Sequence, residues 1–402
     1  MPMMRNKTTP ISTVALRRVP DRPARVAIVV GTRPEAIKMA PVAHAIAERS
    51  ALTPIVISTG QHRELLQQAL GDFGICADID LDLMAPNQTP AEFTARCLDA
   101  ISPVFERERF DAVLVQGDTT TVLAAGLGAA WARTPVGHVE AGLRSFDSAN
   151  PFPEEMHRRL LGSLATWHFA PTARARRNLI DEGVSAERVF TTGNTIVDAL
   201  NGMNLSGEYD AAALNNLPQG RMITMTVHRR ENHGAPLVQI ARAVQTLVER
   251  FADVFAVIPV HPNPNVREVL MDVLGKNSSV HLVLPVCYRD MLRLLKRSTL
   301  IVTDSGGIQE EAPSLGTPVL ITRDVTERPE VVTAGAGRLV GTRHDVIVAE
   351  GSRLLTDDVA YRAMARARNP FGDGLASQRI ADILELRLTG RIASGGRVAD
   401  IA

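Results

Sequence analysis

The chain has 402 residues, more than one hydrophobic core usually organises, so its length favours two domains. Its 44 Lys and Arg residues balance its 44 Asp and Glu residues, which leaves no net field to hold a nucleic acid or an anionic membrane surface. The three cysteines are far apart, and no apolar run approaches the roughly 20 residues of a membrane span, so composition argues against a disulfide framework, a zinc knuckle and a membrane protein and favours the cytoplasm.

The opening residues 1–24 are predicted to be a disordered extension. They carry five basic side chains against the single acid Asp21, and they lack the long apolar core of a secretion signal. A targeting leader or a polyanion-binding arm would also be basic, but chain termini are usually loosely ordered. We expect residues 391–402 to form a tail at the other end.

From residue 25 onward, short β-branched runs alternate with longer helical stretches, as in parallel sheets covered by helices. The first series of predicted strands covers residues 27–30, 54–58, 112–116, 135–140 and 189–193. We assign residues 25–203 to a first Rossmann-like domain.

The segment from Asn201 to Gly220 breaks this rhythm, because it is rich in Asn, Gly and Pro, and it is the best candidate linker. The second series of predicted strands covers residues 222–227, 255–260, 281–286, 300–304 and 318–322. We assign residues 204–374 to a second Rossmann-like domain and residues 375–390 to a C-terminal helix. The predicted fold class is therefore α/β, with two Rossmann-like domains.

Polar side chains follow several predicted strands, at the edge where open parallel sheets bind ligands. After the first strand, Arg33 precedes Pro34, which suits a first helical turn, and Lys38 follows one turn later. Two cations near a helix N-terminus favour an anion site. A solvated turn with surface charges is the alternative.

Acidic residues follow the next strands: Asp118, Glu140, and Glu154 within a Pro-Phe-Pro-Glu-Glu string. Because neighbouring parallel strands end at one edge, Asp118 and Glu140 are expected to face one cleft, where paired carboxylates suit proton transfer. Taken singly, each is more often a helix cap or a solvated charge. Asp118, which precedes three threonines, is a good N-cap.

In the second domain, His228 and Arg229 follow one predicted strand and His261 follows the next. Histidines at successive strand ends, beside arginines, favour an anion or proton-transfer site over a purely structural role. Their spacing does not fit metal ligands, so no metal site is predicted.

The string Ser305-Gly306-Gly307 leads a later strand into a helix. Consecutive small residues let a phosphate reach the backbone N–H groups of a helix N-terminus. Glu311, one turn onward, could accept hydrogen bonds from ribose hydroxyls. A plain tight turn and a solvated helix charge are the alternatives.

Nine strings in one order closely resemble the non-hydrolysing UDP-N-acetylglucosamine 2-epimerase family. They lie between about residues 25 and 385: GTRPEAIKMAP, TGQHRELL, QGDTTT, GHVEAGLRS, PFPEE, TVHRREN, HPNPNVRE, TDSGGIQEEAPSLGTPV and RDVTERPE. The resemblance implies a glycosyltransferase-B-like architecture, in which two Rossmann-like domains face a cleft and the last helix crosses back to the first domain. It also implies a homodimer that needs no metal or nicotinamide.

The resemblance also implies residue roles by matching position. The diphosphate would be held by Arg33, Ser305, Gly306, Gly307 and Arg328, and the ribose by Glu311. The catalytic candidates are Asp118, Glu140, Glu154 and His228. Further support for the substrate site is expected from Lys38, Arg229 and His261.

The expected reaction interconverts UDP-N-acetylglucosamine and UDP-N-acetylmannosamine by elimination of UDP to a glycal and readdition with reprotonation of C2. A hydrolysing relative, a glycosyltransferase and a catalytically silent nucleotide-sugar sensor are alternatives, whereas a redox epimerase is disfavoured because no Gly-x-Gly-x-x-Gly string opens either domain. In some bacterial members, the regions that match residues 59–66 and 151–155 help to form a second UDP-sugar site. The substrate is therefore also a candidate allosteric activator.

Overall fold

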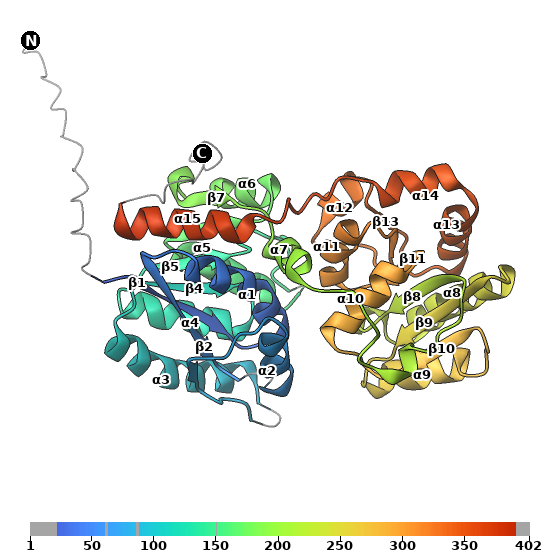
Figure 1. Cartoon of the computed structure of the whole chain (residues 1–402), viewed down its shortest axis with the longest axis horizontal. Helices are drawn as coiled ribbons and strands as arrows, with labels where there is room; N and C mark the ends of the chain where they lie inside the picture. Colours follow the sequence, from blue (N-terminus) through green and yellow to red (C-terminus); the bar gives the residue numbers. More distant parts are fainter. Residues whose placement is uncertain (1–21, 61–62, 86–87, 150, 391–402) are drawn as a thin grey trace, which may run out of the picture.

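The computed structural model describes residues 22–60, 63–85, 88–149 and 151–390. Two parallel sheets covered by helices lie one beyond the other along the long axis of the molecule (Figure 1), which confirms the predicted α/β fold class. The predicted tail and the predicted extension up to residue 21 lie outside the described residues. The first strand already begins at Ala24, inside the range predicted for the extension.

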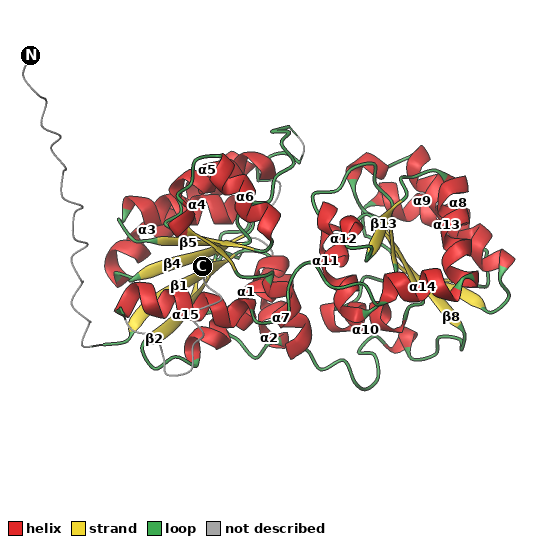
Figure 2. Ribbon diagram, turned by 90° about the horizontal axis from the view of Figure 1, so that it is seen from above, coloured by secondary structure: helices red, strands yellow, loops and turns green. Residues whose placement is uncertain are grey.

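The first lobe is defined as the first sheet with helices α1–α7 and α15. Its described strands lie in the order β3-β2-β1-β4-β5-β6-β7. They are β1 (Ala24–Val30), β2 (Leu52–Ser58), β3 (Ile79–Asp80), β4 (Ala112–Gln116), β5 (Val136–Val139), β6 (Trp167–Ala170) and β7 (Val189–Thr191). The helices, which Figure 2 shows on both faces of the sheet, are α1 (Arg33–Ala47), α2 (Arg63–Asp72), α3 (Pro90–Glu108), α4 (Thr120–Trp131), α5 (Glu154–Leu164), α6 (Ala173–Asp181), α7 (Thr195–Gly202) and α15 (Ala376–Thr389).

The second lobe is defined as the second sheet with helices α8–α14. Its described strands lie in the order β10-β9-β8-β11-β12-β13. They are β8 (Arg221–Thr226), β9 (Val254–Pro259), β10 (Val280–Val283), β11 (Leu300–Thr303), β12 (Val319–Ile321) and β13 (Gly337–Leu339). The helices are α8 (Ala235–Arg250), α9 (Pro264–Leu274), α10 (Tyr288–Arg297), α11 (Gly306–Leu315), α12 (Pro329–Thr333), α13 (His344–Thr356) and α14 (Asp358–Ala365).

In both sheets the strand order reverses beside the first strand of the lobe. β1 lies between β2 and β4, and β8 lies between β9 and β11, with all of these pairs parallel. Open parallel sheets bind ligands at such a reversal, beyond the carboxyl ends of the strands. The loops after these strands are therefore where functional side chains should gather.

Side-chain alternation along β1 anchors helices on both faces of the first sheet. Val26 and Ile28 pack in a buried cluster with Met39 of α1, whereas Val29 packs in another cluster with Phe105 of α3. Burying each such side chain contributes about 1.5–3 kcal/mol. Because both faces are covered, the strand reads as a continuous apolar run.

Three strands, β3, β6 and β13, were not predicted from the sequence. β3 has only two residues, β13 reads Gly-Arg-Leu, and His168 interrupts the apolar run of β6. These segments are strands because a neighbouring strand pairs with them, as β5 pairs His138 with His168. Context of this kind outweighs local propensity in short strands.

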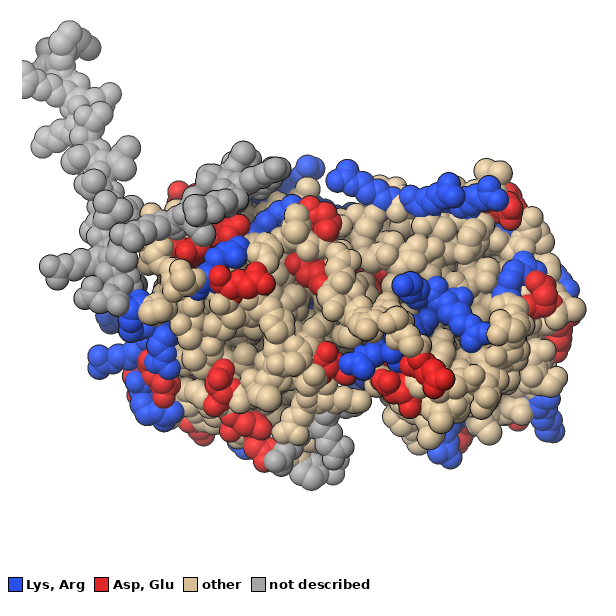
Figure 3. All heavy atoms as spheres, viewed as in Figure 1, with Lys and Arg blue, Asp and Glu red and all other residues tan. Residues whose placement is uncertain are grey.

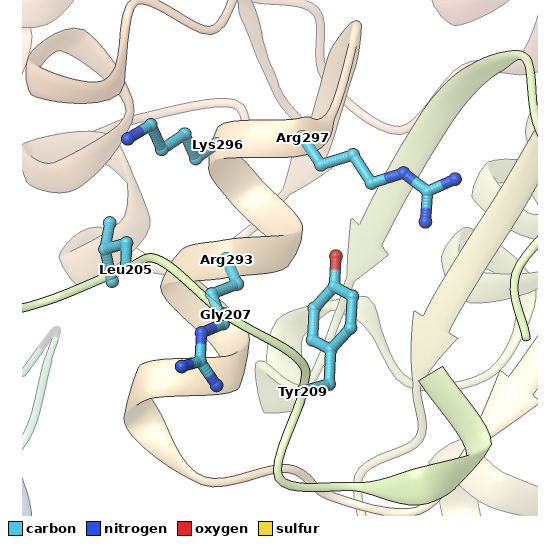
Figure 4. A pocket seen from close by; sticks show the side chains of 6 residues that line it. All are labelled: Leu205, Gly207, Tyr209, Arg293, Lys296 and Arg297. Carbon is cyan, nitrogen blue, oxygen red and sulfur yellow. The ribbon is translucent and has the colours of Figure 1, made fainter. Parts of the chain in front are cut away.

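The predicted linker at residues 201–220 connects α7 to β8 and is tied to α10. The Arg293 guanidinium donates to the carbonyl oxygen of Ser206 at 2.9 Å, and that of Arg297 donates to the carbonyl oxygen of Pro218 at 2.6 Å. Figure 4 shows both arginines beside the linker, around a hollow of about 250 Å³ that no predicted site residue lines. These cations therefore hold the linker against the second lobe.

The surface carries both signs of charge on both lobes, as the face in Figure 3 shows, in keeping with the formal net charge of +0. Among the residues that are described, no helix has the length and apolar character needed to cross a membrane.

The last helix, α15, returns from the second lobe and packs against α1 and α7 of the first (Figure 1). Ile380 and Leu384 are fully buried in the cluster that contains Met39. Just beyond α1, Arg49 donates to the Asp382 carboxylate at 2.7 Å. The chain therefore passes between the lobes twice, once through the linker and once before α15.

Ile380→Ala should lower the free energy of unfolding by about 2–5 kcal/mol, because it leaves a cavity where α15 docks on the first lobe. Val359→Ala on α14, where the side chain is 78% exposed, is the matched control and should change it by less than about 0.5 kcal/mol. Urea denaturation followed by circular dichroism measures both. Equal effects in the two variants would contradict the docking of α15 described above.

Candidate functional site

The turn from β1 into α1 is closed by a buried acid, Glu35. Its carboxylate accepts hydrogen bonds from the Gly31 N–H at 2.7 Å and the Thr32 hydroxyl at 2.8 Å, and burial raises its pKa to about 7. A Cβ on Gly31 would lie 2.2 Å from the Thr121 hydroxyl oxygen, so only glycine fits there. Sequence reasoning singled out this string for Arg33 and missed Glu35, although Thr-x-x-Glu at a helix start is a known capping signal.

Lys38 of α1 is buried between two carboxylates that come from different lobes. Its ammonium forms an ion pair with Glu140, which follows β5, and another with Glu310 of α11 at 2.8 Å. The Asn194 side-chain amide also donates to Glu140 at 3.0 Å. On the far side of Glu310, the Arg328 guanidinium donates to its second oxygen at 2.8 Å.

We call Glu140, Lys38, Glu310 and Arg328 the charge chain, because charges of opposite sign alternate along it. Burial raises the pKa of Glu140 in spite of Lys38. Burial would also raise the pKa of Glu310, but Lys38 and Arg328 outweigh it and hold that pKa below its usual value. Burial lowers the pKa of Lys38, but the two carboxylates raise it by more. The net effect is an increase, so the ammonium stays charged.

The predicted phosphate turn starts α11, with Ser305 as the N-cap. A Cβ on Gly306 would lie 2.8 Å from a terminal guanidinium nitrogen of Arg328, so glycine is needed for Arg328 to approach the turn. A Cβ on Gly307 would meet nothing nearer than the Ser305 hydroxyl at 3.9 Å, which leaves space in front of the helix N-terminus. The turn thus combines free backbone N–H groups with a cation, as an anion site requires.

Glu311 lies one turn into α11, and the Tyr288 hydroxyl donates to its carboxylate at 3.1 Å. Burial raises its pKa to about 7, while the Arg33 charge acts in the opposite direction. Arg33 of the first lobe therefore lies within electrostatic reach of this second-lobe acid. The charge of Arg33 also acts on Asp72 of α2 and on Tyr288.

Asp118, which follows β4, forms an ion pair with Arg158 of α5 at 2.6 Å. Arg158 also donates to Glu155 at 3.0 Å, and an imidazole nitrogen of His157 bonds the Asp118 carbonyl oxygen at 2.8 Å. The N-cap of α4 is Thr119, so the reading of Asp118 as an N-cap is wrong. Arg158 was missed, because nothing in the sequence spacing links α5 to the end of β4.

His228, which follows β8, is held by the buried Asp304. The Asp304 carboxylate lies 3.2 Å from the imidazole and accepts the backbone N–H groups of His228 at 3.0 Å and Arg229 at 2.9 Å. His261, after β9, stacks on His228 with ring centroids 5.8 Å apart. Burial lowers the pKa of His228 despite Asp304, which favours a neutral imidazole at neutral pH.

Some of the predicted site residues contact one another in the structure, and others do not. It joins Lys38 to Glu140 and stacks His228 on His261, but within the described ranges no hydrogen bond or ion pair connects Asp118 or His228 to Glu140. Glu154 opens α5, and one of its carboxylate oxygens is buried without a partner in the described part of the chain. Contacts with a ligand would have to link these groups.

Glu311→Gln should make stability less dependent on pH. The pKa of Glu311 is higher in the folded chain than its ordinary value of 4.5, so the folded state holds this proton more tightly and the free energy of unfolding falls as pH rises from about 4.5 to about 7. The glutamine variant lacks this group's contribution of up to roughly 3 kcal/mol. Urea unfolding of both proteins at pH 5 and pH 8 measures the difference, and an identical pH dependence would contradict it.

Comparison with known proteins identifies the family. A sequence model described as UDP-N-acetylglucosamine 2-epimerase matches residues 44–385. The UDP-N-acetylglucosamine 2-epimerase of Escherichia coli K12 is 48% identical over 369 residues, which cover 90% of this chain and 98% of that protein.

Two solved structures share the α/β, glycosyltransferase-B-like fold. The Neisseria meningitidis UDP-GlcNAc 2-epimerase bound to UDP-GlcNAc has a TM-score of 0.84 and 43% identity, with 90% of this chain and 99% of that chain covered. The S. aureus MnaA–UDP co-structure has a TM-score of 0.85 and 41% identity, with 93% and 100% covered. The chain belongs to the UDP-N-acetylglucosamine 2-epimerase family of isomerases.

Proposed function

We propose that this chain interconverts UDP-N-acetylglucosamine and UDP-N-acetylmannosamine without hydrolysis, with the ligand between the domains predicted at residues 25–203 and 204–374. The observation that carries the proposal is the position of Lys38, which contacts Glu140 of its own lobe and Glu310 of α11, the helix that begins at the Ser305 turn. A proton-transfer group and an anion site are thereby adjacent across the two lobes. The UDP and UDP-GlcNAc in the two related structures support the same ligand class.

The reaction begins with loss of UDP, because the C2 hydrogen of the sugar is next to the anomeric carbon and not to a carbonyl. In the α-linked gluco sugar the C1–O and C2–H bonds are anti. Both bonds break, C1 and C2 become doubly bonded, the electron pair of the C1–O bond leaves with UDP and the proton passes to a base. Readdition of UDP, with protonation of C2 on the opposite face, gives the manno epimer.

The second lobe is proposed to hold UDP. The N–H groups of Gly306 and Gly307 and the Arg328 guanidinium would bind the diphosphate, and Glu311 would accept hydrogen bonds from the ribose. Arg33 would add charge from the first lobe as the diphosphate leaves. Preorganised donors aimed at developing charge are usually the largest contribution to catalysis.

Proton transfer is assigned to four side chains around the strand ends: Asp118, Glu140, Glu154 and His228. Burial raises the pKa of Glu140 above its usual value, which suits a carboxyl that both binds and releases a proton. The lowered pKa of His228 favours an imidazole that can accept a proton. Arg229 and His261 beside His228 are proposed to contact the substrate.

Three further properties of this chain are proposed. We infer a homodimer, which the exposed Trp131 of α4 and Leu160 of the adjacent α5 support as apolar surface on the first lobe. We also propose a cytoplasmic location, and the substrate as an allosteric activator at a second site.

The proposed reaction is tested by incubating the protein with UDP-N-acetylglucosamine in D2O. Product should carry deuterium at C2, and added NAD should make no difference, because no group is oxidised. Proton NMR of C2 measures the exchange. Product that keeps its original C2 hydrogen would refute the scheme, and stoichiometric release of free N-acetylmannosamine would assign the chain to the hydrolysing class instead.

Arg33→Ala should lower turnover more than UDP affinity, because Arg33 would act mainly on charge that develops as the diphosphate leaves. Glu311→Ala should show the opposite pattern, with a large loss of UDP affinity. Calorimetry with UDP and single-turnover kinetics separate the two effects. Equal losses of affinity and turnover in Arg33→Ala would make it an ordinary ground-state contact.

A further inference from the structure

We propose that Glu310 is a positioning residue for the proposed reaction: it fixes Lys38 and Arg328 across the two lobes and leaves Glu140 as the carboxyl of the charge chain that exchanges a proton. This inference rests on the proposed function. Sequence reasoning assigned no role to Glu310, although it is adjacent to Glu311. Its side chain is 1% exposed, so a bound ligand has little access to it.

The two carboxylates of the charge chain are held in different ways. Glu310 faces a cation with each oxygen: Oε2 forms an ion pair with Lys38 at 2.8 Å without hydrogen-bond geometry, and Oε1 accepts a hydrogen bond from Arg328 at 2.8 Å. Both contacts of Glu140, with Lys38 and with Asn194, fall on the same oxygen, Oε2. Its Oε1 has no hydrogen-bond partner among the residues that the structure describes, and is therefore the oxygen that can meet a ligand.

This asymmetry decides which carboxyl carries a proton. A buried carboxylate stays ionised when nearby cations compensate its negative charge. Glu310 has one cation on each oxygen. Glu140 shares its single cation with Glu310, and the negative charge of Glu310 is one of the causes that raise the pKa of Glu140. Glu310 therefore keeps Glu140 protonatable and keeps Lys38 from neutralising it fully.

The charged and titratable groups around this pair come from several elements. Facing Glu140 are Lys38 of α1, Glu310 of α11 and Arg328, which precedes α12. Facing Glu310 are Lys38, Arg328 and Glu140, with Tyr288 of α10 and Glu311 of its own helix beside it. On the side of Arg328 away from Glu310, its guanidinium donates to the Glu327 carboxylate at 3.4 Å.

Glu310→Gln tests the role of this charge, since it removes the charge and keeps the shape of the side chain. Lys38 then faces Glu140 alone, so the pKa of Glu140 should fall by roughly one unit or more. The limb of the pH–rate profile for C2 exchange that depends on Glu140 should move to lower pH by the same amount, whether Glu140 acts as acid or as base. Turnover at neutral pH should fall roughly 100-fold.

UDP affinity distinguishes positioning from a structural role. Arg328 loses a carboxylate partner in Glu310→Gln, so UDP should bind as tightly as in the wild type or more tightly. The matched control is Glu330→Gln, which removes the same charge from another contact between the lobes, the hydrogen bond from Thr172 at 2.8 Å. In this control, the Glu140-dependent limb of the pH–rate profile should lie at the same pH as in the wild type.

Two results would overturn the proposal. The first is a Glu310→Gln variant whose pH–rate profile and turnover match those of the wild type. The second is a Glu310→Gln variant that loses UDP affinity and turnover to the same extent. Carbon-13 NMR titration of the Glu140 carboxyl, assigned with Glu140→Gln, gives a test that does not need catalysis. An unchanged Glu140 pKa in Glu310→Gln would reject the role of Glu310, whereas a wild type that does not exchange C2 would reject the proposed function alone.

Discussion

The position of Lys38 between two carboxylates is the interaction on which the arrangement of the site depends. Taking an ammonium out of water costs several kcal/mol unless close partners compensate it. Glu140 compensates Lys38 within the first lobe, and Arg328 compensates Glu310 within the second, so each lobe alone carries a neutral pair. The contact between Lys38 and Glu310 joins these pairs without adding net charge. The contact between the lobes is therefore favourable, and neither lobe depends on it to pair its own buried ion.

Two other buried acids fix the backbone at the edges of the sheets. Glu35 holds the turn after β1 through the Gly31 N–H, and Asp304 holds the loop after β8 through the N–H groups of His228 and Arg229. In each case a carboxylate replaces the water that would otherwise solvate a backbone donor. Loops tied down in this way hold their side chains in place before a ligand arrives, which preorganised catalysis needs.

Much of this arrangement could be predicted from the sequence. The strand β1 is a continuous apolar run from Val26 to Val30 because both of its faces are covered, and β8 alternates apolar residues with threonine, so both are recognisable as strands. The polar residues after them lie at the edge where such sheets usually bind ligands. The α/β class followed from these patterns, and the family followed from the nine strings that resemble it. Short strands such as β6 could not be predicted, because only pairing with neighbours defines them.

Contacts between distant segments could not be predicted either. Arg158 meets Asp118 because α5 packs on α4, and Glu310 meets Lys38 because the two lobes touch. Neither contact can be recognised from the spacing of residues in the sequence. Glu310 lies within a matched string, but the string does not say which of its two glutamates faces Tyr288 of its own lobe and which faces Lys38 of the other.

The division of charged groups between the lobes has a consequence for the proposed reaction. The helix N-terminus at Ser305 can hold an anion by itself, because the free N–H groups and Arg328 both belong to the second lobe. Arg33, Lys38 and Glu140 belong to the first lobe, so in the proposed reaction they would act on the sugar and on the leaving diphosphate only while the lobes are in contact. Elimination would then be confined to the closed molecule, in which water is excluded and the glycal is held beside UDP until readdition. The ion pair between Lys38 and Glu310 would thus link the closure of the lobes to the chemical step.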